Sequence, residues 1–384
     1  MSSLARDVAI VGVGYSELSR SGEPDPRRLT LTAAKQALAD SGLCSADIDG
    51  IFEYRFGTES PGAQDMARLL GIPDLAGFAD IMPSNPSGLG GVLAGVMAVA
   101  SGACETVLVY RCLTRAAGHT GGVASGPQTV GGRDQFLVPY GYLGGILVLM
   151  GLKKQRWMAE YGSGEEDFGH IAVNARRWSA LNPRAVLREE VTMEDYLSSR
   201  MVSDPLRVLD CDYPVNGAAA TIITTAERAR DLRQPAVLVD AMTYATGRGA
   251  DWIFDCDFLY GGAVDCSNRL WQRSSVGIGD IDVFQIYDGF TPVTVSWIEA
   301  LGACGRGEFS DWVGDGSRLG PGGDFPTNTA GGQLAEGRLH ALGFLNEAVL
   351  QLRGQCDDRQ VSGAQTAVVA SGVYPQCAAM VLTT

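Results

Sequence analysis

The chain has 384 residues, of which 46% are hydrophobic, enough to bury one large core or two moderate ones. Its 30 basic and 44 acidic residues give a formal net charge of −14, which argues against a nucleic-acid or membrane-surface binder, because both need a basic face. No apolar stretch reaches about 18 residues, and nine scattered cysteines lack CxxC spacing, so we expect a soluble cytoplasmic protein without a membrane span or a metal site.

The first part of the chain alternates apolar runs typical of buried strands with segments of helical spacing. The predicted strands are Val8–Gly14, Ile48–Tyr54 and Thr106–Cys112. The predicted helices are Thr30–Asp40, Asp65–Leu70 and Ser87–Ser101. The strand Val8–Gly14 is expected to end in a turn that resembles half of a dinucleotide fingerprint, but the third glycine is absent, which disfavours a nucleotide cofactor.

Residues 113–205 differ from what precedes them, because they are richer in charge and tryptophan. We interpret them as an inserted loop region over the core that contains an amphipathic helix, Glu165–Ala180. The small-residue run Ala218–Thr225 predicts a strand that returns to the core.

A second set of strands and helices follows. The predicted strands are Ala236–Tyr244, Val283–Tyr287, Ala367–Ala370 and Ala378–Leu382, and the predicted helices are Ala263–Ser274, Thr291–Leu301 and Gly337–Leu352. In both parts a glycine-led helix precedes a buried strand, which suggests two similar βα halves. We therefore predict an N-terminal half at 1–112 and 206–235, an insertion at 113–205, and a C-terminal half at 236–384.

Segments in the same order along nearly the whole chain resemble the sterol-carrier/lipid-transfer branch of the thiolase superfamily. They are Val8–Gly14, Pro139–Tyr142, Glu160–Gly162, Asn182–Ala185, Met193–Tyr196, Met201–Arg207 and Asn216–Ala220. The resemblance implies an α/β, thiolase-like fold of two stacked mixed five-stranded sheets, with helices between and around them. It also implies a homodimer, with catalytic groups where helix amino termini meet.

The chain departs from the thiolase pattern at both cysteine positions and at the histidine position. Asn85, before Pro86-Ser87-Gly88, stands where thiolases carry the nucleophilic cysteine, and an amide cannot attack a thioester usefully. Arg338 stands at the usual histidine position, and His340 follows two residues later. The run Ala370–Tyr374 lacks the second, acid/base cysteine.

The run Tyr287-Asp288-Gly289-Phe290 looks like the motif of thiolase-like retro-aldolases, which cleave the side chains of steroid acyl-CoAs. In that group a tyrosine here is thought to serve as base. Those enzymes work with a small OB-fold partner of the DUF35 type, so the resemblance implies a heterotetramer of two chains of each kind.

The resemblance implies that Tyr287 and His340 are catalytic residues. A phenol has an ordinary pKa near 10, so Tyr287 acts as a base only if Arg338 or His340 lowers its pKa; the alternative is a core tyrosine with a satisfied hydroxyl. His340, expected in the first turn of its helix, would donate to a thioester oxygen or relay a proton, or be structural.

Four residues form the predicted substrate-binding set. Asn85 either contacts an oxyanion or substrate hydroxyl, or caps a helix. Arg338 either binds a CoA phosphate, pairs with Glu336, or lowers the pKa of Tyr287. Asp288 and Gly332 complete the set.

The resemblance and these residues favour retro-aldol cleavage of a β-hydroxyacyl-CoA into a ketone or aldehyde and a shorter acyl-CoA, with a steroid side-chain CoA as the expected substrate. No acyl-enzyme, metal or organic cofactor is expected, since coenzyme A enters as the substrate thioester. Two alternatives stay open. One is a non-catalytic thiolase-like partner in an acyltransferase complex, and the other is an acyl-CoA or lipid-binding module.

Overall fold

The computed structural model describes residues 7–22, 24–55, 59–81, 88–114, 135, 145–247, 257–372 and 376–384. Nine strands within these ranges form one mixed sheet in the order β3-β2-β4-β7-β1-β8-β11-β10-β9. Its two parts meet where β1 pairs antiparallel with β8, at Ala9 opposite Leu238 and Ile10 opposite Val237. The sheet therefore has a five-stranded and a four-stranded part.

The five-stranded part belongs to the first half of the chain. Its strands are β1 (Val8–Tyr15), β2 (Gly50–Tyr54), β3 (Gly77–Ile81), β4 (Thr106–Thr114) and β7 (Asn216–Thr225). Its helices are α1 (Pro26–Ser41), α2 (Ala63–Leu70), α3 (Leu89–Ala100) and α7 (Ala226–Ala229). β2 pairs parallel with both β3 and β4, whereas β7 runs antiparallel to its neighbours β4 and β1.

The four-stranded part belongs to the second half. Its strands are β8 (Val237–Ala245), β9 (Val283–Ile286), β10 (Thr366–Ser371) and β11 (Cys377–Thr383). Its helices are α8 (Ala263–Arg273), α9 (Thr291–Leu301), α10 (Phe309–Val313), α11 (Gly332–Ala335) and α12 (Ala341–Leu352). Single 3₁₀ turns lie at Ser45–Asp47, Val208–Asp210, Ile278–Asp280, Ser317–Leu319 and Asp357–Arg359.

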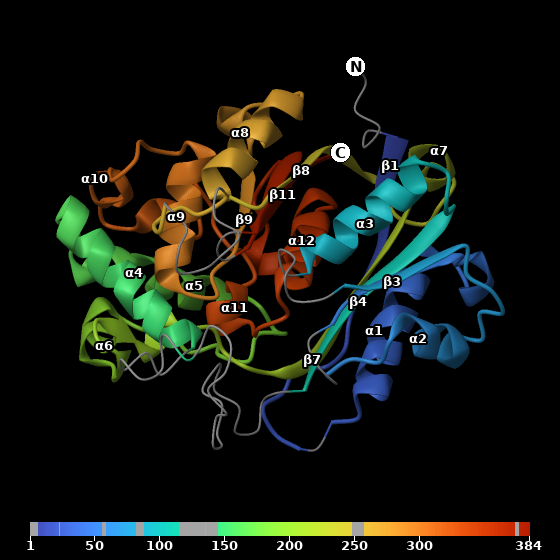
Figure 1. The fold of residues 1–384 in the computed structure, drawn as a ribbon, viewed down its shortest axis with the longest axis horizontal. Coiled ribbons are helices and arrows are strands. Elements are labelled where there is room, and N and C mark those ends of the chain that lie inside the picture. Colours follow the sequence, from blue (N-terminus) through green and yellow to red (C-terminus); the bar gives the residue numbers. More distant parts are fainter. Residues whose placement is uncertain are drawn as a thin grey trace.

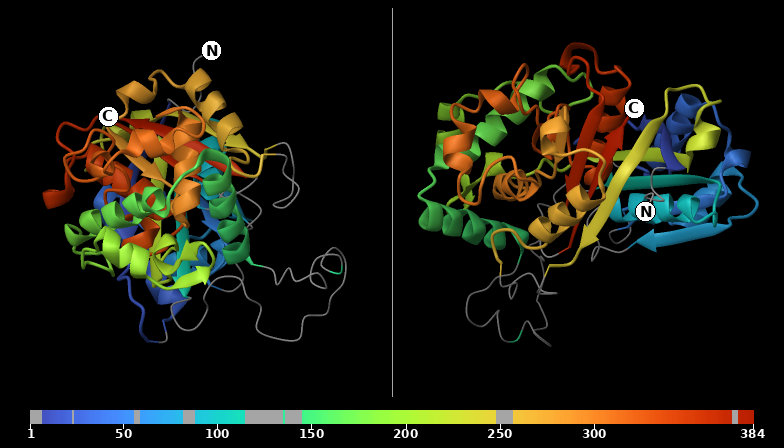
Figure 2. Two further views of the ribbon diagram at one scale, coloured as in Figure 1. Left: turned by 90° about the vertical axis from the view of Figure 1, so that its left-hand side faces the viewer. Right: turned by 90° about the horizontal axis from the view of Figure 1, so that it is seen from above.

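The region expected as an inserted loop is largely helical where it is described. It holds α4 (Ile146–Tyr161), α5 (Glu165–Ala180), α6 (Met193–Ser198) and a small hairpin of β5 (Met201–Ser203) with β6 (Leu206–Arg207). α4 and α5 pack against α9, and α5 packs against α11, so the region covers the C-terminal half. Figure 2 shows these green helices on the side of the orange and red elements, away from the blue N-terminal ones. The domain boundaries stay a prediction.

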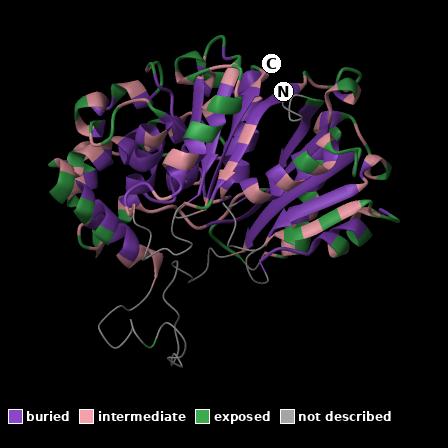
Figure 3. Ribbon diagram, turned by 45° about the horizontal axis from the view of Figure 1, so that its top comes forward, coloured by how far each residue is buried: buried purple, intermediate pink, exposed green. Residues whose placement is uncertain are grey.

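Helices fill the space between the two parts of the sheet and cover their outer faces. α12 packs against β9 and β10 on one side and β7 and β1 on the other, and Figure 1 shows it between the two groups of strands. α1 packs against β1, β7 and β4, and a separate buried cluster lies beneath it. In Figure 3 most strands are buried along their length, whereas the edge strand β3, outer helix turns and loops carry exposed residues.

The expected thiolase-like α/β fold is confirmed, with three differences in detail. The strands form one continuous sheet of five plus four, because β1 and β8 share hydrogen bonds, rather than two separate five-stranded sheets. Gly12 lies inside β1 rather than in a turn. Glycine is needed there because α1 packs closely: a Cβ would come 2.3 Å from the carbonyl oxygen of Ala37. β3 was not expected from the sequence. None of the described helices is long and apolar enough to cross a bilayer.

Candidate active site

Tyr287 follows β9 directly, at the end of a parallel strand pair where functional side chains gather in open α/β sheets. Its backbone N–H donates to the carbonyl oxygen of Ala370 at 2.9 Å, which continues the pairing of β9 with β10. Its buried ring meets Phe344 of α12 edge to face, with ring centres 6.3 Å apart. A Cβ at Gly289 would lie 2.6 Å from this ring, so the motif needs glycine there.

The surroundings of Tyr287 keep its hydroxyl protonated. Burial raises the pKa of Tyr287 above its ordinary value, and the nearby Asp212 and Tyr54 raise it further. Arg338 and the amide of Gln333 lower the pKa, but by less than burial raises it. Arg338 therefore lowers the pKa of Tyr287, as predicted, but the rise caused by burial is larger. At neutral pH the Tyr287 hydroxyl is a hydrogen-bond donor.

Arg338 presents unused donors in this region. Its backbone N–H donates to the carbonyl oxygen of Tyr213 at 2.9 Å, and its Nη1 lies 3.3 Å from Oδ1 of Asp212. Its side chain is 11% exposed, and Nε and Nη2 are buried without a hydrogen-bond partner among the described residues. Such groups are rare inside proteins, because leaving them unpaired costs about 1–3 kcal/mol each. They are well suited to an oxygen atom of a ligand.

The predicted alternative that Arg338 pairs with Glu336 is wrong. Glu336 instead accepts from Nη2 of Arg184 at 3.0 Å and from the side-chain amide of Asn182 at 3.1 Å. The partner of Arg338 is Asp212, whose backbone N–H donates to the carbonyl oxygen of Gly289 at 3.0 Å. Burial raises the pKa of Asp212, and Arg338 opposes that shift.

His340 lies just before α12, not in its first turn as expected, because Gly337–His340 is not helical. Its φ of +53° lies in the left-handed region that side chains other than glycine rarely adopt, at a cost of about 1–3 kcal/mol. Its Nδ1 accepts a hydrogen bond of 3.1 Å from Nε of Arg111. The ring of Tyr54 meets its imidazole edge to face at 5.4 Å.

Asp288 and Gly332 meet at the start of α11. The Asp288 side chain is fully buried, and its Oδ1 accepts from the backbone N–H of Gln333 at 2.8 Å. Gly332 has φ +60°, and a Cβ there would lie 1.9 Å from Oδ2 of Asp288, so only glycine fits. Burial raises the pKa of Asp288 to about 7. Both residues shape the loop beside Tyr287, and their predicted contact with substrate stays a prediction.

The structure thus links Tyr287 to Arg338 by their electrostatic interaction, and Tyr54 interacts with both Tyr287 and His340. Asp288 follows Tyr287 directly and meets Gly332. Asn85 lies outside the described residues, so its role stays a prediction. The sequence reasoning missed four neighbours: Tyr54, Arg111, Asp212 and Gln333. Arg111 carried a usable signal, because an arginine within the apolar run 107–113 is buried and must have partners. In the ranges described, no three His, Cys, Asp or Glu side chains are grouped to hold a metal ion.

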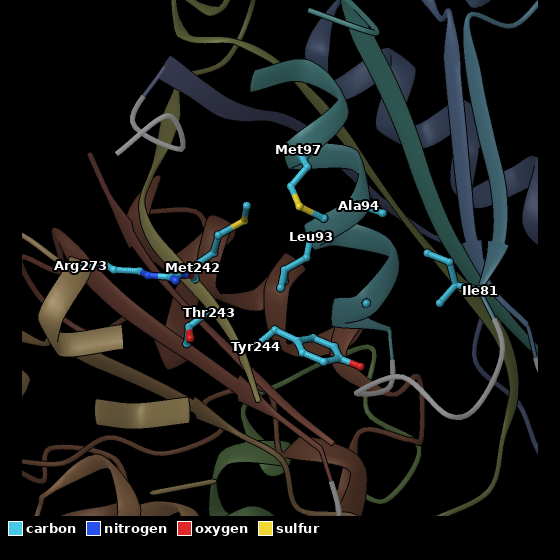
Figure 4. Close-up of a pocket in the computed structure, with 9 residues that line it drawn as sticks. Ile81, Leu93, Ala94, Met97, Met242, Thr243, Tyr244 and Arg273 are labelled. Carbon is cyan, nitrogen blue, oxygen red and sulfur yellow. The ribbon is translucent and has the colours of Figure 1, made fainter. Parts of the chain in front are cut away.

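An apolar hollow of about 300 Å³ is lined by a different set of residues. Figure 4 shows Leu93 and Met97 of α3 on one side of it and Met242 and Tyr244 of β8 on the other. Ile81, the last residue of β3, completes the rim. Its lining is apolar apart from Arg273 and Thr243, which is more typical of a surface that contacts another protein than of a catalytic site.

Comparison with known proteins shows which proteins this chain resembles. Residues 252–384 match the family model described as "Thiolase C-terminal domain-like". The chain is 32% identical to the 17-hydroxy-3-oxo-4-pregnene-20-carboxyl-CoA lyase of Mycobacterium tuberculosis, over 99% of this chain and 100% of the relative. It is 34% identical to the steroid side-chain-cleaving aldolase of Thermomonospora curvata, over 92% of each chain.

A solved structure of an aldolase is also similar to this chain. The Ltp2-ChsH2(DUF35) aldolase superposes with a TM-score of 0.89 at 30% identity, over 99% of this chain and 98% of that one.

Proposed function

Because this chain belongs to the thiolase-like family that contains these two lyases, we propose that it is a carbon–carbon lyase acting on a β-hydroxyacyl-CoA. The relatives are named for steroid substrates, so we propose a steroid side-chain CoA as the substrate class. The products are a ketone or aldehyde and a shorter acyl-CoA. A cytoplasmic location, and a reaction that needs no metal or organic cofactor, are part of the proposal.

The observation that carries this proposal is a group of buried and half-buried hydrogen-bond donors, with no thiolate found beside them in the part of the chain that the structure describes. Tyr287, Arg338 and His340 supply the donors. Two cysteines lie next to other residues of the site in sequence: Cys112 follows Arg111, and Cys211 precedes Asp212. Burial raises the pKa of Cys112 to about 11 and also raises the pKa of Cys211, so both stay thiols at neutral pH. A thiol is a poor nucleophile, whereas hydrogen-bond donors can stabilise an enolate without any covalent intermediate.

The retro-aldol steps balance without a covalent intermediate. A base takes the proton of the β-hydroxyl, and the oxygen electron pair forms the new C=O as the Cα–Cβ bond breaks. The electrons of that bond give a thioester enolate, which regains one proton at Cα. We assign Arg338 and His340 as donors to the enolate oxygen, and each such donor typically contributes a factor of about 10²–10³ in rate.

Tyr287 is the residue that we assign to the β-hydroxyl. As a base it must first lose its proton, which burial opposes and the positive charge of Arg338 favours. In the unliganded chain the phenol stays protonated, so its first role is to donate to the substrate oxygen. Its proton is lost only when the bound substrate or a partner changes the balance between burial and charge.

We further propose a homodimer that forms through β3. β3 is an edge strand of the sheet, so one side of its backbone is unpaired by the described strands. Phe78 of β3 and Met97 of the adjacent α3 are 51% and 55% exposed, and the apolar hollow lies beside them. A bare strand edge flanked by apolar side chains favours pairing with a second copy across a two-fold axis.

The Ltp2-ChsH2(DUF35) aldolase contains a DUF35 protein. On that basis we propose that this chain also works with a small OB-fold partner of the DUF35 type, as a heterotetramer of two chains of each kind. Light scattering of the co-expressed proteins tests both parts: the expected mass is two of each chain. A lone monomer at micromolar concentration would contradict the assembly.

Incubation with β-hydroxyacyl-CoAs, with and without the DUF35-type partner, tests the activity. Ketone or aldehyde and shortened acyl-CoA should form in equal amounts. The two rival functions predict other results. A non-catalytic subunit of an acyltransferase complex would restore acyl transfer to a cysteine-bearing paralogue, and a binding module would bind acyl-CoA and leave it intact.

A further inference from the structure

Arg111 is a charged residue in the middle of a buried strand, and each of its side-chain nitrogens has one defined partner. It lies on β4 with an exposure of 0%. Its Nη1 donates to the backbone oxygen of Tyr54 at 3.2 Å, and its Nη2 donates to the carboxylate of Glu59. Its Nε donates to Nδ1 of His340 at 3.1 Å. The guanidinium therefore cannot rotate away from the imidazole without breaking an ion pair.

This contact fixes which imidazole nitrogen carries the proton. Arginine has five N–H donors and no acceptor, so the nitrogen of His340 that faces Arg111 must offer its lone pair. A neutral histidine has one donor nitrogen and one acceptor nitrogen, and accepting at Nδ1 leaves the proton on Nε2. Protonating Nδ1 as well would set two N–H groups and two positive charges against each other.

Two neighbouring side chains also contact Arg111: the carboxylate of Glu59 and the ring of Tyr54. Glu59 forms an ion pair with Arg111, so its negative charge stabilises the guanidinium. Tyr54 presents its ring to the imidazole and to the guanidinium, whose carbon lies 5.3 Å from the ring centre. Burial lowers the pKa of Arg111 only to about 10, so the guanidinium is charged at neutral pH.

We propose that Arg111 is a positioning residue that holds His340 as the neutral Nε2–H tautomer, ready to donate to the enolate oxygen of the substrate. The catalytic part of this inference rests on the proposed function. The tautomer itself is a property of the resting protein. An Nε2–H donor stabilises a developing oxyanion without delivering its proton to the oxygen, which suits a reaction whose proton belongs at Cα.

Nitrogen NMR of the histidine-labelled protein tests the tautomer directly. The chain has only three histidines, His119, His170 and His340, and a His340→Asn variant identifies the signals of the third. At pH 7 we expect His340 to show a protonated Nε2 and an unprotonated Nδ1. An Nδ1–H tautomer or an imidazolium in the wild-type protein would overturn the proposal, whatever the variants do.

Arg111→Met then separates positioning from folding. We expect His340 to lose its single tautomer and kcat to fall by about 10²–10³-fold, the typical effect of losing one oxyanion donor. If Arg111→Met does not fold, the double variant with Glu59→Gln removes the stranded carboxylate and makes the same test. Arg228→Met is the matched control, because Arg228 contacts β4 at Thr106 and pairs with Asp47, and it should leave the tautomer and kcat unchanged.

The remaining outcomes are distinct. A folded Arg111 variant with an unchanged His340 spectrum would overturn the positioning role. Absence of cleavage by a wild-type protein whose His340 is Nε2–H would refute the proposed function and leave the tautomer supported.

Discussion

Replacing Tyr287 by phenylalanine removes one oxygen and keeps the ring that packs against Phe344. The side-chain amide of Gln333 faces the hydroxyl, and the amide atoms have no hydrogen-bond partner of ordinary geometry among the described residues. We therefore expect the free energy of unfolding to change by less than about 0.5–1 kcal/mol, because no buried partner is stranded.

The effect on catalysis should be much larger. Loss of a general acid or base typically costs a factor of about 10²–10⁴ in rate, which is about 2.7–5.5 kcal/mol in the activation barrier at 1.36 kcal/mol per tenfold. The fall should appear in kcat with KM nearly unchanged, because the interaction strengthens in the transition state. Steady-state cleavage of the best β-hydroxyacyl-CoA, followed by chromatography of the CoA thioesters, measures both constants.

Tyr110→Phe is the matched control. Tyr110 is also fully buried, but its hydroxyl donates to the carbonyl oxygen of Pro61 at 2.7 Å, in the separate cluster beneath α1. Its loss should lower stability by about 1 kcal/mol and leave kcat unchanged. Full turnover by Tyr287→Phe, or equal losses of kcat in the two variants, would refute the role assigned to Tyr287.

Three further predictions follow from other features. Asp288 keeps its proton in the folded state up to a pKa of about 7, whereas the unfolded state loses it near 3.8, so stability should fall as pH rises through this window. Thermal unfolding of Asp288→Asn should show a weaker fall; parallel curves for the two proteins would contradict the shift. Intact-mass spectrometry after incubation with acyl-CoA should show no adduct, and a stable mass gain on a cysteine would exclude a non-covalent reaction. Met97→Glu should produce monomers in light scattering, while Leu152→Glu should not, because Leu152 is also exposed but lies on α4; a dimeric Met97 variant would place the interface elsewhere.

The fold was predictable because its strands are continuous apolar runs of characteristic length. The run Thr106–Cys112 is part of β4, and the run Ala378–Leu382 is part of β11. β3 could not be predicted, because Gly77–Ile81 alternates partly exposed with exposed residues at the sheet edge and so lacks an apolar signature. The boundary at α12 was missed because Gly337 and His340 adopt positive φ, which a helical pattern does not reveal.

The site was predictable only where a motif marks it. Tyr287 and His340 lie at motif positions, and in the structure Tyr54 interacts with both. Arg111 and Asp212 come from β4 and the segment before β7, and their approach depends on the pairing of distant strands. The pKa of Tyr287 could not be read from the sequence either, because burial outweighs the nearby arginine.

The central claim is cleavage of a carbon–carbon bond without an acyl-enzyme. The most direct test is single-turnover reaction of the chain, with its DUF35-type partner, on a steroid β-hydroxyacyl-CoA labelled at Cα. We predict that one ketone or aldehyde and one shortened acyl-CoA form per substrate, that Cα gains one solvent proton, and that the protein mass stays unchanged throughout. Intact substrate after prolonged incubation with the complex, or products that appear only with an acylated protein, would contradict the account.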